Sequence, residues 1–279
     1  HRDLHSFPTR RSSDLLRKLC FEGPLDELSQ TVNSQPCIVT ASIAALEVAR
    51  AGGLQQPDFV LGLSLGEYSA LYAAGVLSLE GAVALVHLRG RAMQKAATAS
   101  PGAMASLMGA DEAAVNGIVE RVAACGVITV ANYNCPGQYV LSGSVEAIDA
   151  ASEAAKALPR VRVIRLNVSG AFHSPLMAAA ASELASALDQ FEWTQAGVPV
   201  VQNVNFTPET DPERIRKNLV AQLTGSVHFE RSVRALASLG ATRFREVGPG
   251  RVLSGLLKRI DPGLTTTSHG TCAELASLA

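Results

Sequence analysis

A Gly-x-Ser-x-Gly pattern, Gly62 to Gly66, lies between a short apolar run and a segment with helical spacing. The apolar run, Phe59 to Leu61, predicts a buried strand. A sharp strand-to-helix turn strains the backbone of its serine and exposes the hydroxyl group. We therefore predict that Ser64 is a catalytic nucleophile. The next amide, that of Leu65, would point from a helix N-terminus to where an oxyanion forms. The alternative is an ordinary turn.

The composition excludes several classes of protein. The chain has 279 residues, of which 47% are hydrophobic and 18% charged, so it is not intrinsically disordered. A net charge of −1 gives no electrostatic reason to expect nucleic acid or an acidic membrane surface as a partner. The five cysteines are scattered, which argues against a disulfide framework or a zinc site. No apolar run reaches the ~18 residues of a membrane span. We expect a cytoplasmic protein without metal, cofactor or membrane.

The first fifteen residues differ from the rest of the chain. They are basic, have no apolar periodicity and lack the apolar region of a signal peptide. The run from Phe7 to Leu15 looks like the translation of a sequencing-adapter oligonucleotide. We interpret residues 1–15 as a non-native or disordered start that lies outside the fold.

Alternating strands and helices predict a large α/β domain formed by residues 16–100 and 168–279. Ser78 is expected to cap one of its helices. Strands that alternate with helices imply a mostly parallel sheet covered on both faces. The expected helices are 37–51, 79–97, 176–190, 212–223, 229–239 and 252–260, and the expected later strands are 198–203 and 243–247.

Residues 101–167 have a different pattern. The order strand, helix, strand, strand, helix, strand is that of a ferredoxin-like α+β unit. The expected strands are 103–108, 127–133, 138–142 and 161–166, and the expected helices are 111–124 and 145–158. We predict a small domain inserted into the larger one.

A serine nucleophile needs a base, and histidine titrates near neutrality. Of the six histidines, His173 lies in a loop bounded by glycine, serine and proline where the chain re-enters the large domain, which suits a site. His87 has the pattern of a helix face, His228 precedes a helix, and His269 lies in a polar tail. We predict His173 as the base. No acidic residue is an obvious third member, so we expect a dyad or a carbonyl that orients the imidazole.

Two further residues are ambiguous from the pattern alone. Arg89, on an apolar helix, suggests a carboxylate partner, because guanidinium binds carboxylates in a bidentate manner. Its surroundings in the sequence nevertheless favour a solvated helix face. Gln222 by itself has the pattern of an ordinary helix residue.

Five motifs together resemble malonyl-CoA:acyl carrier protein transacylases. The likeness runs in order from about Leu16 to the C-terminus and includes the small inserted domain of that family. The motifs are Gly62-Leu63-Ser64-Leu65-Gly66-Glu67-Tyr68-Ser69-Ala70-Leu71, Leu88-Arg89-Gly90-Arg91-Ala92-Met93-Gln94, Asn132-Tyr133-Asn134-Cys135-Pro136-Gly137-Gln138, Gly170-Ala171-Phe172-His173-Ser174-Pro175-Leu176-Met177 and Glu246-Val247-Gly248-Pro249-Gly250.

The resemblance implies an α/β-hydrolase-like large domain and a monomer that takes malonyl-CoA and acyl carrier protein as substrates for fatty-acid synthesis. It implies that Ser64 is acylated, that His173 is its base and that Arg89 pairs with the malonyl carboxylate. It further implies three kinds of supporting position. Gln222 would lie beside the Ser64–His173 dyad, and a backbone carbonyl there would orient His173. Leu65 N–H would be an oxyanion donor. Asn134 and Arg162 would border the cleft that binds CoA.

The chain departs from the family at two places. Leu63 stands where the family has histidine before the serine, which alters hydrogen bonds around the elbow but leaves the nucleophile. Nothing before Leu15 matches the first strand and the Gly-Gln-Gly-Ser-Gln loop with which the family opens. We expect the elbow strand to lack a neighbour in the sheet and the oxyanion to lack its second donor.

Three other interpretations remain open at this stage. The first is the acyltransferase domain of a polyketide synthase or fatty-acid megasynthase. The second is a serine hydrolase such as a thioesterase, although those enzymes place an acid between serine and histidine in the chain. The third is a catalytically impaired fragment that folds or binds carrier protein without turning over.

Overall fold

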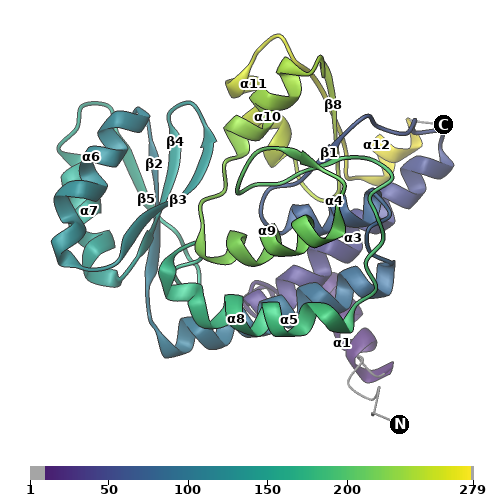
Figure 1. Cartoon of the computed structure of the whole chain (residues 1–279), viewed down its shortest axis with the longest axis horizontal. Helices are drawn as coiled ribbons and strands as arrows, with labels where there is room; N and C mark the ends of the chain where they lie inside the picture. Colours follow the sequence, from purple (N-terminus) through teal and green to yellow (C-terminus); the bar gives the residue numbers. More distant parts are fainter. Residues whose placement is uncertain (1–9, 278–279) are drawn as a thin grey trace.

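The computed structural model describes residues 10–277, which form a larger helix-rich unit and a smaller unit built on one sheet (Figure 1). The predicted start at residues 1–9 lies outside the described residues. Residues 10–15 form the beginning of α1 (Arg10–Glu22), so the first helix starts inside the stretch that we set apart. Leu19 of this helix is buried.

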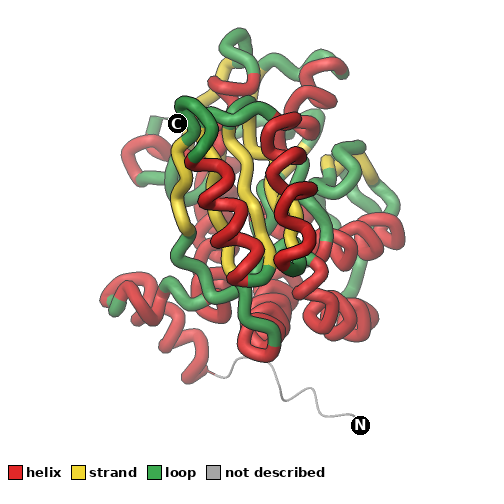
Figure 2. Tube along the Cα trace, turned by 90° about the vertical axis from the view of Figure 1, so that its left-hand side faces the viewer, coloured by secondary structure: helices red, strands yellow, loops and turns green. Residues whose placement is uncertain are grey.

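The smaller unit contains a four-stranded antiparallel sheet in the order β3-β4-β2-β5. Its two helices pack on one face of this sheet and share one apolar core with it (Figure 2). The sequence-based boundaries agree closely, and the strand predicted at 103–108 has those bounds. The elements are β2 (Ala103–Met108), α6 (Glu112–Val122), β3 (Ile128–Cys135), β4 (Gln138–Gly143), α7 (Val145–Lys156) and β5 (Arg162–Arg165).

The larger unit is formed by the chain on both sides of this sheet. Its largest apolar core lies among α3, α4, α5, α8 and α9. Its elements are α1, α2 (Leu25–Leu28), α3 (Thr31–Ala51), β1 (Val60–Leu61), α4 (Gly66–Ala73), α5 (Leu79–Ala99), α8 (Ala178–Ala187), β6 (Val200–Val201), β7 (Pro208–Glu209), α9 (Pro212–Thr224), α10 (Phe229–Ser238), β8 (Arg243–Val247), α11 (Val252–Ile260), β9 (Thr265–His269) and α12 (Cys272–Ala276).

The helices α3 and α5 pack side by side. Their backbones approach closely at Gly90, where an added Cβ would lie 2.9 Å from the carbonyl oxygen of Thr31. Ser78 caps α5 as predicted, since its side chain accepts a hydrogen bond from Gly81 N at 3.0 Å. The start that we predicted for α3 is wrong. The helix begins at Thr31, and Pro36 lies inside it, although a proline there removes one backbone hydrogen bond.

The larger unit has two short sheets with parallel pairs. In the first, β1 pairs in parallel with β6, and β6 pairs in antiparallel with β7. In the second, β8 pairs in parallel with β9. Within residues 10–277, β1 therefore has β6 as its one strand partner, and β8 has β9. The fold is α/β, as predicted.

The strand β9 was missed because its sequence, Thr265–His269, is polar. Each of its residues pairs with one of β8, and threonine is β-branched and suits a strand. His269 was expected in a polar tail, but it ends this strand and is only 6% exposed.

The two units are joined by backbone hydrogen bonds as well as by the chain. Tyr133 N donates to Val227 O at 2.9 Å, and Val227 N donates to Ala131 O at 2.8 Å. The strand β3 has register irregularities on both sides of this bridge. Such bulges redirect side chains, and they lie here at the edge of a cleft between the units. No helix in the described range is long and apolar enough to cross a membrane.

Candidate active site

The elbow connects β1 to α4 and places Ser64 at the turn. Ser64 has a φ of +50°, which is the strained left-handed conformation expected for a serine in such a turn. Gly62 is required by close packing, because an added Cβ would lie 2.0 Å from the carbonyl carbon of Gly66. Leu65 is the N-cap of α4, so its amide lies at the positive end of that helix.

An asparagine that we did not single out from the sequence supports the turn. Asn203 Oδ1 accepts a hydrogen bond from Ser64 N at 2.6 Å, and Asn203 Nδ2 donates to Gly62 O at 2.7 Å. Asn203 is fully buried and follows β6, the parallel partner of β1. Its place at the end of the strand predicted at 198–203 was the available signal, because the ends of adjacent parallel strands meet at one edge of a sheet.

His173 lies against Ser64, as the sequence predicted. Its Nε2 is 2.7 Å from Ser64 Oγ, and its Nδ1 is 2.7 Å from the backbone oxygen of Gln222. A carbonyl only accepts, so Nδ1 carries the proton and Nε2 is free to accept the serine proton. Burial, and secondarily the positive charge of Arg89, lowers the pKa of His173 to about 4. The imidazole is therefore neutral near neutral pH, as a general base must be.

Arg89 reaches the same point from α5. Its Nη2 lies 3.1 Å from Ser64 Oγ and 3.3 Å from Gln222 Oε1, and its Nη1 donates to Gln35 Oε1 at 2.8 Å. The interpretation of Arg89 as a solvated helix-face residue is wrong, because the side chain is 1% exposed. Its Nε has no hydrogen-bond partner in the described part of the chain. A buried cation with an unused donor beside a nucleophile is suited to bind an anionic substrate group.

Most of the predicted residues meet at one cleft of about 420 Å³. Ser64, Leu65, Arg89, His173 and Asn134 line it, together with residues of α3, β2, β4 and α11. Asn134 is 8% exposed, and its Oδ1 lacks a partner among the described residues.

The other two predicted residues do not line the cleft. Gln222 lies buried directly behind the Ser64–His173 pair, where it contacts Arg89. Arg162 is an exposed residue of β5 and is not among the residues that line the cleft. Besides Asn203, the sequence interpretation missed Gln35, which holds Arg89, and Glu67, which lies beneath the elbow. Glu67 has the spacing of an ordinary helix residue, and Gln35 precedes the helix predicted at 37–51, so the pattern gave no signal for either.

The fold and this geometry define an α/β protein in which a serine at a strand-to-helix turn contacts a buried, neutral histidine and a buried arginine. A family model described as "Acyl transferase domain" matches residues 13–269. The chain belongs to this acyl transferase family.

Curated relatives and solved structures agree with that assignment. A malonyl CoA-acyl carrier protein transacylase of Bacillus subtilis is 45% identical over 252 residues, which cover 90% of this chain and 79% of that protein. The crystal structure of a malonyl-CoA:acyl carrier protein transacylase from Xanthomonas oryzae is 42% identical, has a TM-score of 0.90 and covers 94% of this chain and 83% of its own.

A third relative was solved as a complex of two proteins. It is a malonyl-transacylase in complex with a type II PKS acyl-carrier protein, with 38% identity and a TM-score of 0.89, covering 94% of this chain and 85% of that one. The family inferred from the five motifs is confirmed by these relatives.

Proposed function

We propose that this chain transfers a malonyl group from malonyl-CoA to the phosphopantetheine thiol of an acyl carrier protein, for fatty-acid synthesis. The names of curated relatives with 44% and 45% identity support this activity. The observation that carries the choice of acyl group is the buried Arg89, 3.1 Å from the nucleophile. A malonyl group carries its carboxylate one methylene from the thioester carbonyl. One group can therefore meet Arg89 and Ser64 together.

The first half-reaction forms an ester on Ser64. Ser64 Oγ attacks the thioester carbonyl while its proton passes to His173 Nε2, and Leu65 N–H stabilises the oxyanion. The tetrahedral intermediate collapses, the C–S bond breaks, and CoA leaves as a thiol with the proton from His173. Arg89 holds the malonyl carboxylate throughout.

The second half-reaction repeats these steps in reverse with a new thiol. His173 Nε2 takes the proton of the carrier-protein thiol as its sulfur attacks the ester carbonyl. The C–O bond to Ser64 breaks, and the proton returns to Ser64 Oγ. The kinetics are expected to be ping-pong, with malonyl-Ser64 as the shared intermediate.

We also propose a more detailed division of the α/β fold into domains. Residues 101–167 form a ferredoxin-like domain inserted into an α/β-hydrolase-like domain of residues 16–100 and 168–279. The strand order β3-β4-β2-β5 with two helices on one face supports this division.

We propose that Asn134 and Arg162 of the smaller domain contact CoA. The Oδ1 atom of Asn134, which lacks a partner among the described residues, supports the role of Asn134. We propose a cytoplasmic monomer, and free cysteines throughout suit that compartment.

The test is direct. The protein is incubated with malonyl-CoA, and its intact mass and tryptic peptides are measured. We expect one malonyl adduct on the peptide that contains Ser64, lost on addition of holo acyl carrier protein with formation of malonyl carrier protein. An unmodified protein would favour the impaired-fragment alternative. Hydrolysis without transfer to the carrier would favour a thioesterase.

A further inference from the structure

Glu67 is a buried carboxyl directly beneath the elbow. It is the second residue of α4, is 1% exposed and forms no ion pair within residues 10–277. Its carboxyl oxygens instead face three N–H donors. Oε1 accepts from Gln202 Nε2 at 3.0 Å, and Oε2 accepts from Asn203 N at 3.0 Å and from Gln222 Nε2 at 2.8 Å. Burying a carboxyl group is costly unless it is paired with a charge or fully hydrogen-bonded.

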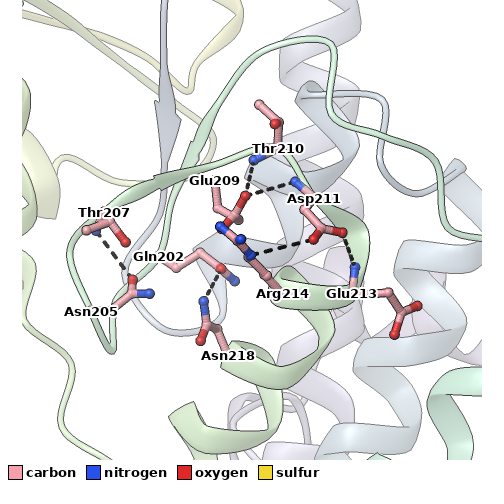
Figure 3. Close-up of polar contacts among 9 residues, drawn as sticks. All are labelled: Gln202, Asn205, Thr207, Glu209, Thr210, Asp211, Glu213, Arg214 and Asn218. Carbon is pink, nitrogen blue, oxygen red and sulfur yellow. Dashed lines mark hydrogen bonds and ion pairs between the residues drawn. The ribbon is translucent and has the colours of Figure 1, made fainter.

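In these hydrogen bonds Glu67 must be the acceptor, because its partners Asn203 and Gln202 can only donate to it. The Asn203 donor is a backbone amide and cannot be reversed. The Gln202 amide is held at both ends, because its Nε2 also donates to Ile215 O at 3.2 Å and its Oε1 accepts from Asn218 Nδ2 at 2.6 Å (Figure 3). The position beneath the elbow therefore requires a group that only accepts, which is an ionised carboxylate.

One contact of Glu67 leads to the acyl-binding arginine. Because the Nε2 of Gln222 faces Glu67, its Oε1 faces Arg89 Nη2 at 3.3 Å. The Gln222 amide thus lies between an anion and a cation with its dipole aligned to both. A reversed amide would place its NH₂ group against the guanidinium and its oxygen against the carboxylate.

A second contact leads to the nucleophile. Glu67 holds the backbone of Asn203, whose side chain binds both Ser64 N and Gly62 O. The same carboxyl therefore supports the residue that fixes the strained turn, whatever acyl group is being transferred.

We propose that Glu67 is a positioning residue that sets the preference for a dicarboxylic acyl group, because it holds the Gln222 amide with its oxygen toward Arg89. This inference rests on the proposed function. It gives a role to Glu67, which takes no part in the two half-reactions described above. Its effect passes through Gln222, so Glu67 itself contacts neither the acyl group nor the reacting atoms.

The test compares malonyl-CoA with acetyl-CoA in the first half-reaction. Glu67→Gln keeps the volume but replaces one acceptor with a donor. We expect kcat/KM for acylation by malonyl-CoA to fall about ten- to a hundredfold, the scale of one lost charge-assisted hydrogen bond. Acylation by acetyl-CoA should fall much less. Burial raises the pKa of the Glu67 carboxyl to about 7, so the assay is run at pH 8, where wild type carries the carboxylate.

The matched control is Glu209→Gln. Glu209 likewise accepts two backbone N–H groups, those of Thr210 and Asp211 (Figure 3). Unlike Glu67 it is only partly buried and pairs with Arg214 at 3.5 Å, and it does not line the cleft. It should leave the malonyl-to-acetyl ratio unchanged. Thermal unfolding of each variant separates loss of fold from loss of selectivity, and Glu67→Asp is a second variant in case Glu67→Gln does not fold.

A double-mutant cycle decides whether Glu67 acts through Gln222. In a Gln222→Leu background, Glu67→Gln should change the malonyl-to-acetyl ratio no further. Equal losses for both substrates in whichever Glu67 variant folds, or ratio changes that multiply independently in the double variant, would overturn the proposal. A wild type that forms no malonyl adduct would instead contradict the proposed function, so the two failures are distinguishable.

Discussion

Arg89 Nη2 lies 3.1 Å from Ser64 Oγ, so the same guanidinium that would bind a substrate carboxylate also contacts the nucleophile. A carboxylate is a stronger acceptor for guanidinium than a neutral hydroxyl. We infer that an arriving malonyl carboxylate takes over this donor and leaves Ser64 Oγ bonded to His173. Binding of the substrate therefore also frees Ser64 Oγ from its hydrogen bond with Arg89.

The first prediction concerns the two reacting residues. Ser64→Ala should abolish the malonyl adduct, because no other hydroxyl or thiol occupies the elbow. His173→Ala should slow acylation by about 10²–10⁴, the usual contribution of general base catalysis. Intact-mass kinetics with malonyl-CoA measure both. An adduct of unchanged stoichiometry on Ser64→Ala would contradict the nucleophile assignment.

The second prediction concerns the acyl group. Arg89→Ala should weaken acylation by malonyl-CoA by roughly 2–4 kcal/mol more than acylation by acetyl-CoA, because only malonyl presents a carboxylate to a buried guanidinium. The measurement is kcat/KM with each thioester. Lys95→Ala, which removes an exposed cation of the same helix, is the control. Equal losses for both thioesters would make Arg89 a structural residue.

The third prediction concerns the protonation of His173. Burial and the nearby Arg89 lower its pKa to about 4, so the imidazole should stay neutral from pH 8 down to about pH 5. The unfolded chain takes up this proton near pH 6.5. Between about pH 6.5 and 4 the unfolded state therefore binds more protons, and the free energy of unfolding should fall as the pH falls.

Two measurements check this prediction. Nitrogen chemical shifts of the imidazole, assigned by comparison with His173→Ala, follow the protonation directly. In Arg89→Ala the His173 pKa should rise, because a repelling cation is removed. A wild-type imidazole that titrates near pH 6.5 would show that the ring is more solvated than its burial indicates.

The fourth prediction separates the two glycines of the motif. Gly62→Ala should destabilise the elbow and prevent acylation, because its Cβ would lie 2.0 Å from the backbone of Gly66. Gly66→Ala should be tolerated, since an added Cβ meets nothing within 4 Å and the residue begins a helix. Thermal unfolding and adduct formation test both variants. Equal damage from both would mean that backbone freedom, rather than close packing, accounts for the pattern.

The fifth prediction concerns the sheet around the elbow. Within residues 10–277, β1 pairs with β6 alone and β8 with β9 alone, so one edge of β1 and one edge of β8 have no strand against them. Adding the opening strand and glutamine loop expected from the family resemblance should raise the unfolding midpoint. It should also raise malonyl transfer by at least about a hundredfold, the effect of one oxyanion donor. Equal midpoints and rates with and without this addition would contradict the interpretation of residues 1–15.

Local patterns were sufficient for much of the fold and part of the site. The strand at 243–247 and the helix at 252–260 have the predicted bounds, because apolar periodicity and flanking glycines define them. Ser64 and His173 were found because both lie in loops with distinctive composition. Arg89 could not be assigned from its own surroundings, because its burial depends on residues far away in the chain.

Other features depend on pairing that no local pattern encodes. The polar strand β9 exists because β8 lies beside it, and the start of α3 depends on packing against α5 rather than on the proline at 36. Asn203 and Glu67 meet although they are separated by 136 positions in the chain. Only the assembled sheet brings them together.

The unequal surroundings of Gly62 and Gly66 also bear on how such motifs are searched for. A pattern that demands glycine at both places treats two different constraints as one. Gly62 cannot be replaced by a residue with a side chain, because the backbone of Gly66 faces it. At Gly66, by contrast, an added Cβ meets nothing within 4 Å. A search that fixes the first glycine and relaxes the second should recover functional members of this family that the stricter pattern discards.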